Sequence, residues 1–222
     1  MNLKAIRILF LKDLFLSRRH LFAYFVGGLA ASALACSPNA TLAFVGFILV
    51  ITVAIAAGIH LIGTLLLSET TDQTKLFVMS LPISLLDYSI GKISVVLTTY
   101  LLPWTAMFAC LIIATFVMGK QGNLAVLPAI FLFLLCAFML QLVTAVISES
   151  IGWTICVMVG CNVGMNVFLM QLFANAEVAE VVKSDVLSWP SLVLQIIGVE
   201  LLIISVALAA AFLFQTRKRD LI

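Results

Sequence analysis

The chain has 222 residues, of which 64% are hydrophobic and only 10% charged, and its formal net charge is +2. A soluble domain of this size could not bury so much apolar surface, so the composition excludes a soluble globular fold and predicts a polytopic membrane protein. The apolar runs are continuous over about 20 residues, which favours membrane-spanning helices over the alternating strands of a β-barrel.

Residues 1–20 place basic and apolar side chains ahead of the first long apolar run. Lys4, Arg7 and Arg18 fall on one side of a helix, and apolar residues cluster on a neighbouring side. This pattern predicts an amphipathic interfacial helix on the inner leaflet, with its cations near lipid phosphates. An ordinary basic flank before the first membrane span is the alternative interpretation.

Six apolar runs predict an all-α fold with six transmembrane helices. The predicted spans are residues 21–36, 41–67, 93–118, 124–147, 151–174 and 191–214. Two polar segments, 68–92 and 175–190, separate the spans where the other connections are short. No room remains for a second, soluble domain, so we expect one transmembrane domain over residues 1–222.

The basic residues predict how the chain is oriented in the membrane. Ten of the 12 Lys and Arg residues fall on one side of the predicted spans, and only Lys120 and Lys183 fall on the other. Because cytoplasmic loops carry the excess of Lys and Arg, both termini and segment 68–92 are expected in the cytoplasm. The expected location is the cytoplasmic membrane of a bacterium.

Segment 68–92 is the longest polar-bearing stretch of the chain. Glu69 and Asp72 suit the first turn of a helix that Ser68 or Thr70 caps, and Pro82 ends it. The segment also carries a compact apolar group, made of Leu76, Phe77, Val78, Met79 and Leu81. Exposed apolar side chains outside the membrane indicate a partner surface, here predicted to be a soluble ATPase. Embedding of this group in the inner leaflet is the alternative.

Polar and small residues inside two spans mark candidate functional faces. His60 lies in the inner half of the second span, and Gly160, Asn162, Gly164 and Asn166 alternate along the fifth. Two glycines four residues apart let another helix approach closely, and the asparagines can add hydrogen bonds there. These residues predict a substrate path or a subunit interface, with packing inside one chain as the alternative.

Glu200 lies about ten residues into the sixth span, where a carboxylate is costly without a partner. A structural partner, such as a nearby glutamine or a backbone group, is the main expectation, and a proton-coupled role is the alternative.

The outer segment 175–190 is net acidic and is predicted to form a short surface helix. It either attracts a cationic substrate or is a solvated cap. The five cysteines are expected to be small core residues.

The chain lacks the motifs of an enzyme. No G-x-x-x-x-G-K-[ST], H-E-x-x-H or G-x-S-x-G sequence occurs, so no phosphate-binding loop, zinc site or nucleophile elbow is predicted. We therefore expect a transport subunit that binds no metal or cofactor of its own.

The pattern E-x5-K-L-x3-S-L-P-I-S-x6-G-K lies between the second and third spans. The matching residues are Glu69, Lys75, Leu76, Ser80, Leu81, Pro82, Ile83, Ser84, Gly91 and Lys92, and Arg219, Asp220 and Leu221 follow at the end of the chain. With a basic amphipathic start and six spans, this order resembles the permease subunits of ABC-2 type ATP-binding-cassette exporters. Leu85 departs from that family, which usually has a basic residue at this position.

The resemblance implies a function and a set of partners. Segment 68–92 would contain the family's coupling helix, and residues 1–20 its connecting helix. Two ATPase subunits, which hold ATP and Mg, would dock on this segment of two permeases, identical or paralogous. The docking residues would be Glu69, Asp72, Lys75, Leu76, Phe77, Met79, Leu81 and Pro82. The first, second and fifth spans would meet at the dimer interface, and His60, Asn162 and Asn166 would lie there.

The implied activity is export of a hydrophobic or amphipathic substrate, such as a peptide, an antibiotic or a lipid-like molecule. Haem-export permeases are a subset alternative. Membrane lipid is an expected partner and nucleic acid is not. The alternatives from another class are a secondary carrier, which usually has broken helices and mid-bilayer charges, and a non-transporting membrane partner or immunity protein.

Overall fold

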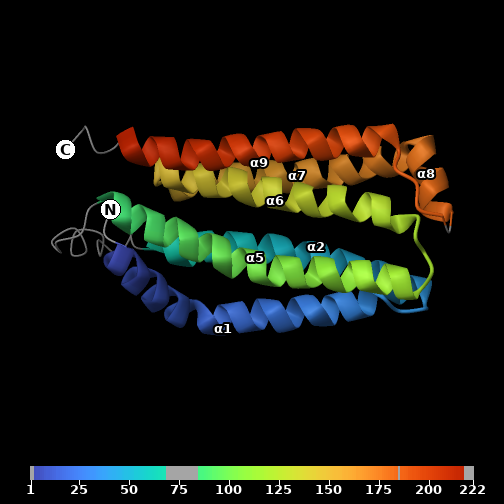
Figure 1. Cartoon of the computed structure of the whole chain (residues 1–222), viewed down its shortest axis with the longest axis horizontal. Coiled ribbons are helices and arrows are strands. Elements are labelled where there is room, and N and C mark those ends of the chain that lie inside the picture. Colours follow the sequence, from blue (N-terminus) through green and yellow to red (C-terminus); the bar gives the residue numbers. More distant parts are fainter. Residues whose placement is uncertain (1–2, 69–84, 185, 218–222) are drawn as a thin grey trace.

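The structure is a computed structural model of the chain, and it describes residues 3–68, 85–184 and 186–217. All elements in these ranges are helical. The long helices are α1 (Leu3–Ala35), α2 (Ala40–Ile62, continued by the π-helix η1, Gly63–Leu67), α5 (Leu85–Val117), α6 (Asn123–Ser148), α7 (Ile151–Ala174) and α9 (Ser191–Arg217). The short helix α8 (Ala176–Lys183) lies between α7 and α9 in the chain (Figure 1).

Five stretches of these helices are long and apolar enough to cross a membrane. They are Ala40–Leu67, Asp87–Val117, Asn123–Ser148, Ile151–Ala174 and Ser191–Phe214. They correspond to the second to sixth predicted spans. The third begins six residues before the predicted 93, and the fifth and sixth agree at both ends. The all-α fold is therefore confirmed, and the chain has the helices of a multi-pass membrane protein.

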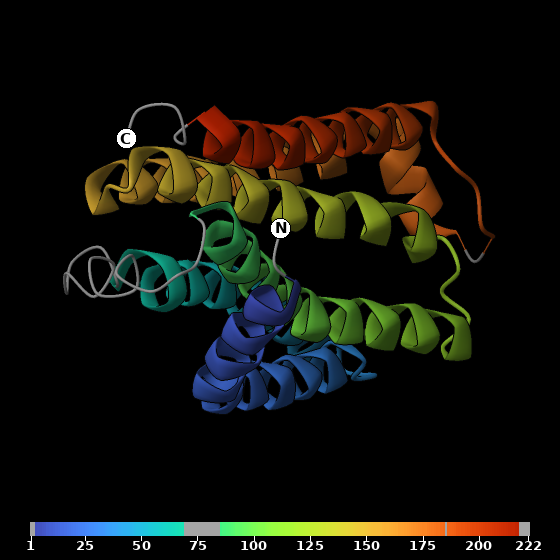
Figure 2. The same cartoon turned by 60° about the vertical axis from the view of Figure 1, so that its left-hand side comes forward.

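The first predicted span needs a correction. Residues 1–20 and 21–36 were expected to form two elements, but residues 3–35 form the single continuous helix α1. The sequence between Leu3 and Val26 has no glycine or proline to break it. Only the part of α1 after Arg19 is continuously apolar, and α1 is not among the five stretches that can span a membrane. Figures 1 and 2 show its N-terminal part slanting toward α5.

The long helices form two layers. Helices α1, α2 and α5 make one layer, and α6, α7 and α9 make the other (Figure 1). Helix α6 contacts α7 and α9 in its own layer and α2 and α5 in the other, and it is the most buried of the candidate spans. The packing of α1 on α2 and on α5 is more extensive than the contacts between the layers. Helix α8 lies at the end of the bundle opposite both termini.

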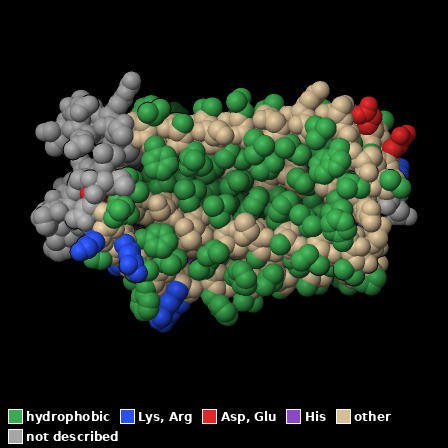
Figure 3. All heavy atoms as spheres, in the orientation of Figure 1, with side chains coloured by type: hydrophobic (Ala, Val, Ile, Leu, Met, Phe, Trp, Pro, Cys, Tyr) green, Lys and Arg blue, Asp and Glu red, His purple; other side chains and the backbone are tan. Residues whose placement is uncertain are grey.

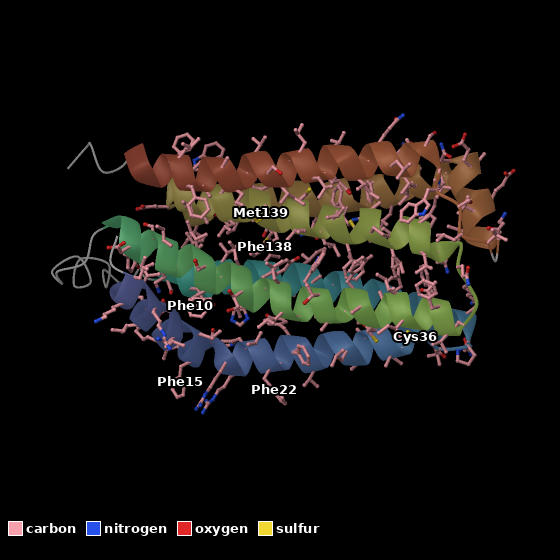
Figure 4. The ribbon with its side chains drawn as sticks, in the orientation of Figure 1. Phe10, Phe15, Phe22, Cys36, Phe138 and Met139 are labelled. Atoms are coloured by element: carbon pink, nitrogen blue, oxygen red, sulfur yellow. The ribbon has the colours of Figure 1, made fainter. Side chains whose placement is uncertain are left out.

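Aromatic side chains fix α5 against α6. The rings of Tyr100 and Phe138 stack with 3.8 Å between their centroids and an interplanar angle of 6°. The indole Nε1 of Trp104 donates to the Phe131 carbonyl at 3.1 Å, and Tyr100 Oη donates to the Leu134 carbonyl at 3.4 Å. These aromatic groups thus fill space between the two layers, where Phe138 lies (Figure 4), and their polar atoms find partners there.

Two tight connections set the direction of the helices. Asn39 caps α2 by accepting a 2.9 Å hydrogen bond from the Thr41 backbone N–H on its Oδ1. Helix α6 ends at Ser148 and α7 begins at Ile151, with Glu149 in the left-handed region at φ 49°. The predicted short connection at 148–150 is therefore confirmed, and it makes α6 and α7 antiparallel neighbours.

Apart from Glu200 on α9, most of the described charges lie toward the two ends of the bundle. Figure 3 shows a hydrophobic band between basic side chains at one end and acidic side chains at the other. The basic side chains that α1 exposes are Lys4, Arg7, Lys12, Arg18 and Arg19. At the opposite end, α8 exposes Glu177 and Glu180, while Val178 is fully buried, so the short helix predicted in segment 175–190 is present. Cytoplasmic exposure of the basic end stays a prediction.

Candidate functional site

A buried ion pair joins α1 to α5 near the basic end of the bundle. Lys92 Nζ lies 2.8 Å from Asp13 Oδ2, and the two side chains are only 5% and 3% exposed. Lys12 Nζ is 3.6 Å from Asp13 Oδ1, but the Lys12 side chain is half-exposed. Gly91, beside Lys92, faces Ile6 and Leu9 of α1. We call Ile6, Leu9, Asp13, Gly91 and Lys92 the α1–α5 junction.

A second polar contact joins α1 to α2. Tyr24 Oη and His60 Nδ1 share a hydrogen bond of 2.7 Å, and the His20 ring meets the His60 ring edge-on at 4.5 Å between centroids. His60 was predicted to line a substrate path or a subunit interface. Within one chain, the partly buried His60 ring contacts α1, so its described contacts are those of a helix-packing residue.

The predicted Gly/Asn face of α7 contacts little of its own chain. A Cβ added at Gly160 would meet no heavy atom within 4 Å, and one added at Gly164 would meet only Phe133, at 3.6 Å. The Nδ2 groups of Asn162 and Asn166 donate to carbonyls one turn earlier in α7, at 3.2 Å and 2.9 Å. The expected hydrogen bonds to another helix are therefore absent among the described residues, and packing inside the chain does not cover Gly160.

Leucine at Gly160 is expected to weaken assembly of two copies without disturbing the fold of one. The site is open in the single chain, so the new side chain clashes only with a second helix that packs there. Gly198→Leu on α9 is the matched control, because its Cβ also meets nothing within 4 Å. Energy transfer between labelled copies in liposomes measures assembly. Equal transfer for Gly160→Leu, Gly160→Leu/Gly164→Leu and the control would remove α7 from the interface.

The surroundings of the Glu200 carboxylate differ from the main expectation, which was a structural hydrogen-bond partner. The side chain is 5% exposed, and neither carboxylate oxygen has a hydrogen-bond partner among the described residues. Gln141 therefore does not supply one, and its own buried Oε1 is also without a partner among the described residues. The Cys136 thiol contacts the backbone carbonyl of Glu200 at 3.3 Å and leaves the carboxylate untouched. The expectation of a glutamine or backbone partner for this carboxylate is therefore wrong for the described chain.

The predicted ATPase-docking residues lie outside the described residues. They are Glu69, Asp72, Lys75, Leu76, Phe77, Met79, Leu81 and Pro82. The described chain stops at Ser68, just beyond η1, and resumes with the first residue of α5, Leu85. The coupling helix thus stays a prediction, whereas the helices on both sides of it are in place.

The single chain does not gather the predicted intramembrane residues into one site. His60 lies on α2, Asn162 and Asn166 on α7, and Glu200 on α9, and each of these helices packs on α6. Among the described residues, no group of three His, Cys, Asp or Glu side chains is arranged to hold a metal ion. The arrangement of these residues offers helix-packing faces and a buried acid.

Sequence reasoning missed the partners of two charged or polar residues. Asp13 is the one acidic residue in the basic stretch 1–20, and this exception could have suggested a buried pair with a lysine. Nothing in the sequence around Tyr24 indicated that it would be the hydrogen-bond partner of His60. The cysteines were expected in the core; Cys136 is buried, but Cys156 is exposed on α7.

Comparison of the chain with protein-family models, with curated proteins and with solved structures found no match.

Proposed function

We propose that this chain is the permease subunit of an ABC-2 type exporter, which moves a hydrophobic or amphipathic substrate outward with ATP hydrolysed by a separate ATPase. The observation that carries the proposal is the α1–α5 junction. Segment 68–92 connects the second and third long helices at the basic end of the bundle, and it continues directly into α5. Lys92, two turns into α5, is tied to α1 by the buried ion pair.

The junction gives the docking segment a mechanical connection to the membrane helices. A displacement of the segment would move the start of α5, and the Asp13–Lys92 pair would carry that displacement to α1. Because α1 is also bonded to α2 through Tyr24 and His60, the three helices would move as one body. The contacts of this body with α6 are less extensive than those inside it, so the body could tilt against the other layer.

The exposed faces of α1, α2 and α7 support pairing of two permeases. Phe22 of α1, Phe44 of α2 and Val163 of α7 are 70%, 65% and 59% exposed. Large apolar groups on a membrane helix can face lipid or a second helix, and Gly160 adds room for close approach on α7. We propose that two copies, or this chain and a paralogue, pair through these helices in the cytoplasmic membrane of a bacterium, with both termini inside.

The N-terminal half of α1 would lie at the inner surface of this membrane. A 33-residue helix is about 50 Å long, which exceeds a hydrocarbon thickness of about 30 Å. The exposed side chains here are both basic and apolar, and the Arg18 guanidinium lies 3.9 Å from the centroid of the Phe15 ring. That mixture suits a helix that rests among lipid headgroups.

Replacing Leu76 and Phe77 with aspartate is expected to abolish ATPase binding while the chain still inserts in the membrane. The apolar group would lose its largest members, and loss of such interface anchors typically weakens binding by about tenfold to a thousandfold. Gln73→Asp/Thr74→Asp is the matched control, because it adds the same charge to the same segment and keeps the apolar group. The measurement is the ratio of ATPase to permease after co-purification in mild detergent.

An unchanged ratio in the Leu76→Asp/Phe77→Asp variant would place the docking surface elsewhere. If neither the wild-type chain nor the control retains an ATPase that survives the same detergent in a known complex, the exporter assignment is wrong. The secondary-carrier and non-transporting alternatives then take its place.

A further inference from the structure

A pocket lies between α6, α7 and α9, on the side of the bundle away from α1. Its volume is about 450 Å³, which is within the range of small-molecule sites. The lining is almost entirely apolar and includes Phe133, Leu140, Phe168, Ile196 and Ile203. Leu140 and Ile203 are also exposed on the outer surface of the helices, so the pocket opens sideways, toward the apolar interior of a membrane.

One charged group lines this apolar pocket, and it is Glu200. The side chain is 5% exposed, and both carboxylate oxygens are buried without a hydrogen-bond partner among the described residues. The ion pairs of Asp13 with Lys12 and Lys92 lie on the α1 and α5 side of the bundle, away from this pocket. The pocket therefore offers two carboxylate oxygens that no described group of the chain uses, and a cationic ligand would favour their ionised form.

The depth of Glu200 makes an unmet acceptor costly. It is the tenth residue of α9, which places it about 14 Å along the helix axis, near the middle of a span. An ionised carboxylate without a partner is strongly disfavoured at such a depth. A ligand that brings N–H donors and a positive charge removes this cost and forms charge-assisted hydrogen bonds.

We propose that this pocket binds a hydrophobic amine, with the protonated nitrogen at Glu200 and the apolar body against Phe133, Phe168 and Ile196. A purely apolar ligand would leave the carboxylate unpaired, and an anion would be repelled by it. A quaternary ammonium ion would match the charge but has no N–H group to donate. The site does not depend on the proposed export function, because binding of the amine requires no ATPase.

The test uses 1-aminoadamantane, a compact hydrophobic amine, and purified chain in lipid nanodiscs. Saturable binding of the radiolabelled amine is expected, and Glu200→Gln should raise its Kd about tenfold or more, because it removes a charge-assisted hydrogen bond. Glu177→Gln, on the exposed surface of α8, is the matched control and should leave the Kd unchanged. Empty nanodiscs give the background from partition into lipid. Equal Kd values in the wild type and Glu200→Gln, or binding no greater than in empty nanodiscs, would overturn the proposal.

A second measurement detects occupancy of the pocket directly, in a protein that keeps Glu200. Cys161 lines the pocket, so a variant that keeps only this cysteine reports occupancy through its rate of alkylation by N-ethylmaleimide. The amine is expected to slow alkylation, and 1-adamantanol, which has the same apolar body without the charge, is expected to leave the rate unchanged. Equal effects of the two compounds, or no effect of the amine, would show that Glu200 does not recruit a cation to this pocket.

Discussion

Replacing Lys92 with methionine is expected to destabilise the chain by about 3 kcal/mol, the lower end of the cost of breaking a buried ion pair. The substitution keeps the length of the side chain and removes its charge. Asp13, 3% exposed, would keep the half-exposed Lys12 at 3.6 Å in place of the buried lysine. Fluorescence-detected size-exclusion chromatography after heating should therefore show unfolding at a lower temperature.

A double variant separates lost charge from lost packing. Asp13→Asn/Lys92→Met removes both charges with little change in volume, so it should regain most of the stability that Lys92→Met loses. Lys120→Met is the control, because it removes an exposed lysine at the opposite end of the bundle. If Lys92→Met unfolds at the same temperature as the Lys120→Met control, the ion pair does not hold α1 to α5. In the exporter account, the stable double variant should still bind the ATPase but transport less, because the junction no longer resists the displacement of α5.

Replacing Gly46 with leucine is expected to disrupt the α1–α2 hairpin. Even a Cβ at this position would lie 2.6 Å from Ala35 Cα and closer still to the Ala35 backbone nitrogen. Backbone atoms cannot rotate away as a side chain can, so α1 and α2 must separate. Overpacking of this kind typically costs about 1–3 kcal/mol and occasionally more, and leucine should reach the upper end. The measurement is the same thermal assay, together with the yield of monodisperse protein.

Two alanine variants separate the steric clash at Gly46 from the general effect of replacing a helical glycine. Alanine has a higher helix propensity than glycine, a gain of about 1 kcal/mol. Gly46→Ala should nevertheless destabilise the chain, because the clash with the α1 backbone outweighs that gain. Gly27→Ala in α1 is the control, since a Cβ there meets no heavy atom within 4 Å, and it should be neutral or slightly stabilising. Equal stability of Gly46→Ala and Gly27→Ala would show that the two helices are not in this close contact.

Much of the fold could be predicted because long apolar runs with short polar breaks determine membrane helices almost locally. The predicted span 151–174 has the bounds of α7, and the predicted span 41–67 has the extent of α2 with η1. Backbone groups in lipid must bond within their own helix, so an apolar run of about 20 residues has few alternatives. The predicted helix at the start of segment 175–190 appears as α8 for a similar reason, because its valines recur at helical spacing.

The misses concern tertiary contacts, which no local pattern encodes. The division of α1 at residue 20 followed a change in composition, but a helix continues through such a change when no residue breaks it. The pairing of Asp13 with Lys92 joins residues 79 positions apart and depends on how α1 packs on α5. Likewise, whether Glu200 has a partner depends on which side chains of α6 and α7 face α9, and apolar residues and cysteines face it.

The measurement that tests the central claim most directly is purification of the tagged chain from its native membranes in mild detergent, with mass spectrometry of the proteins that accompany it. The exporter account predicts an ATPase with a phosphate-binding loop in a near one-to-one ratio to the permease. Recovery of the chain without any nucleotide-binding protein, from a detergent extract in which a known transporter complex stays intact, would contradict the account.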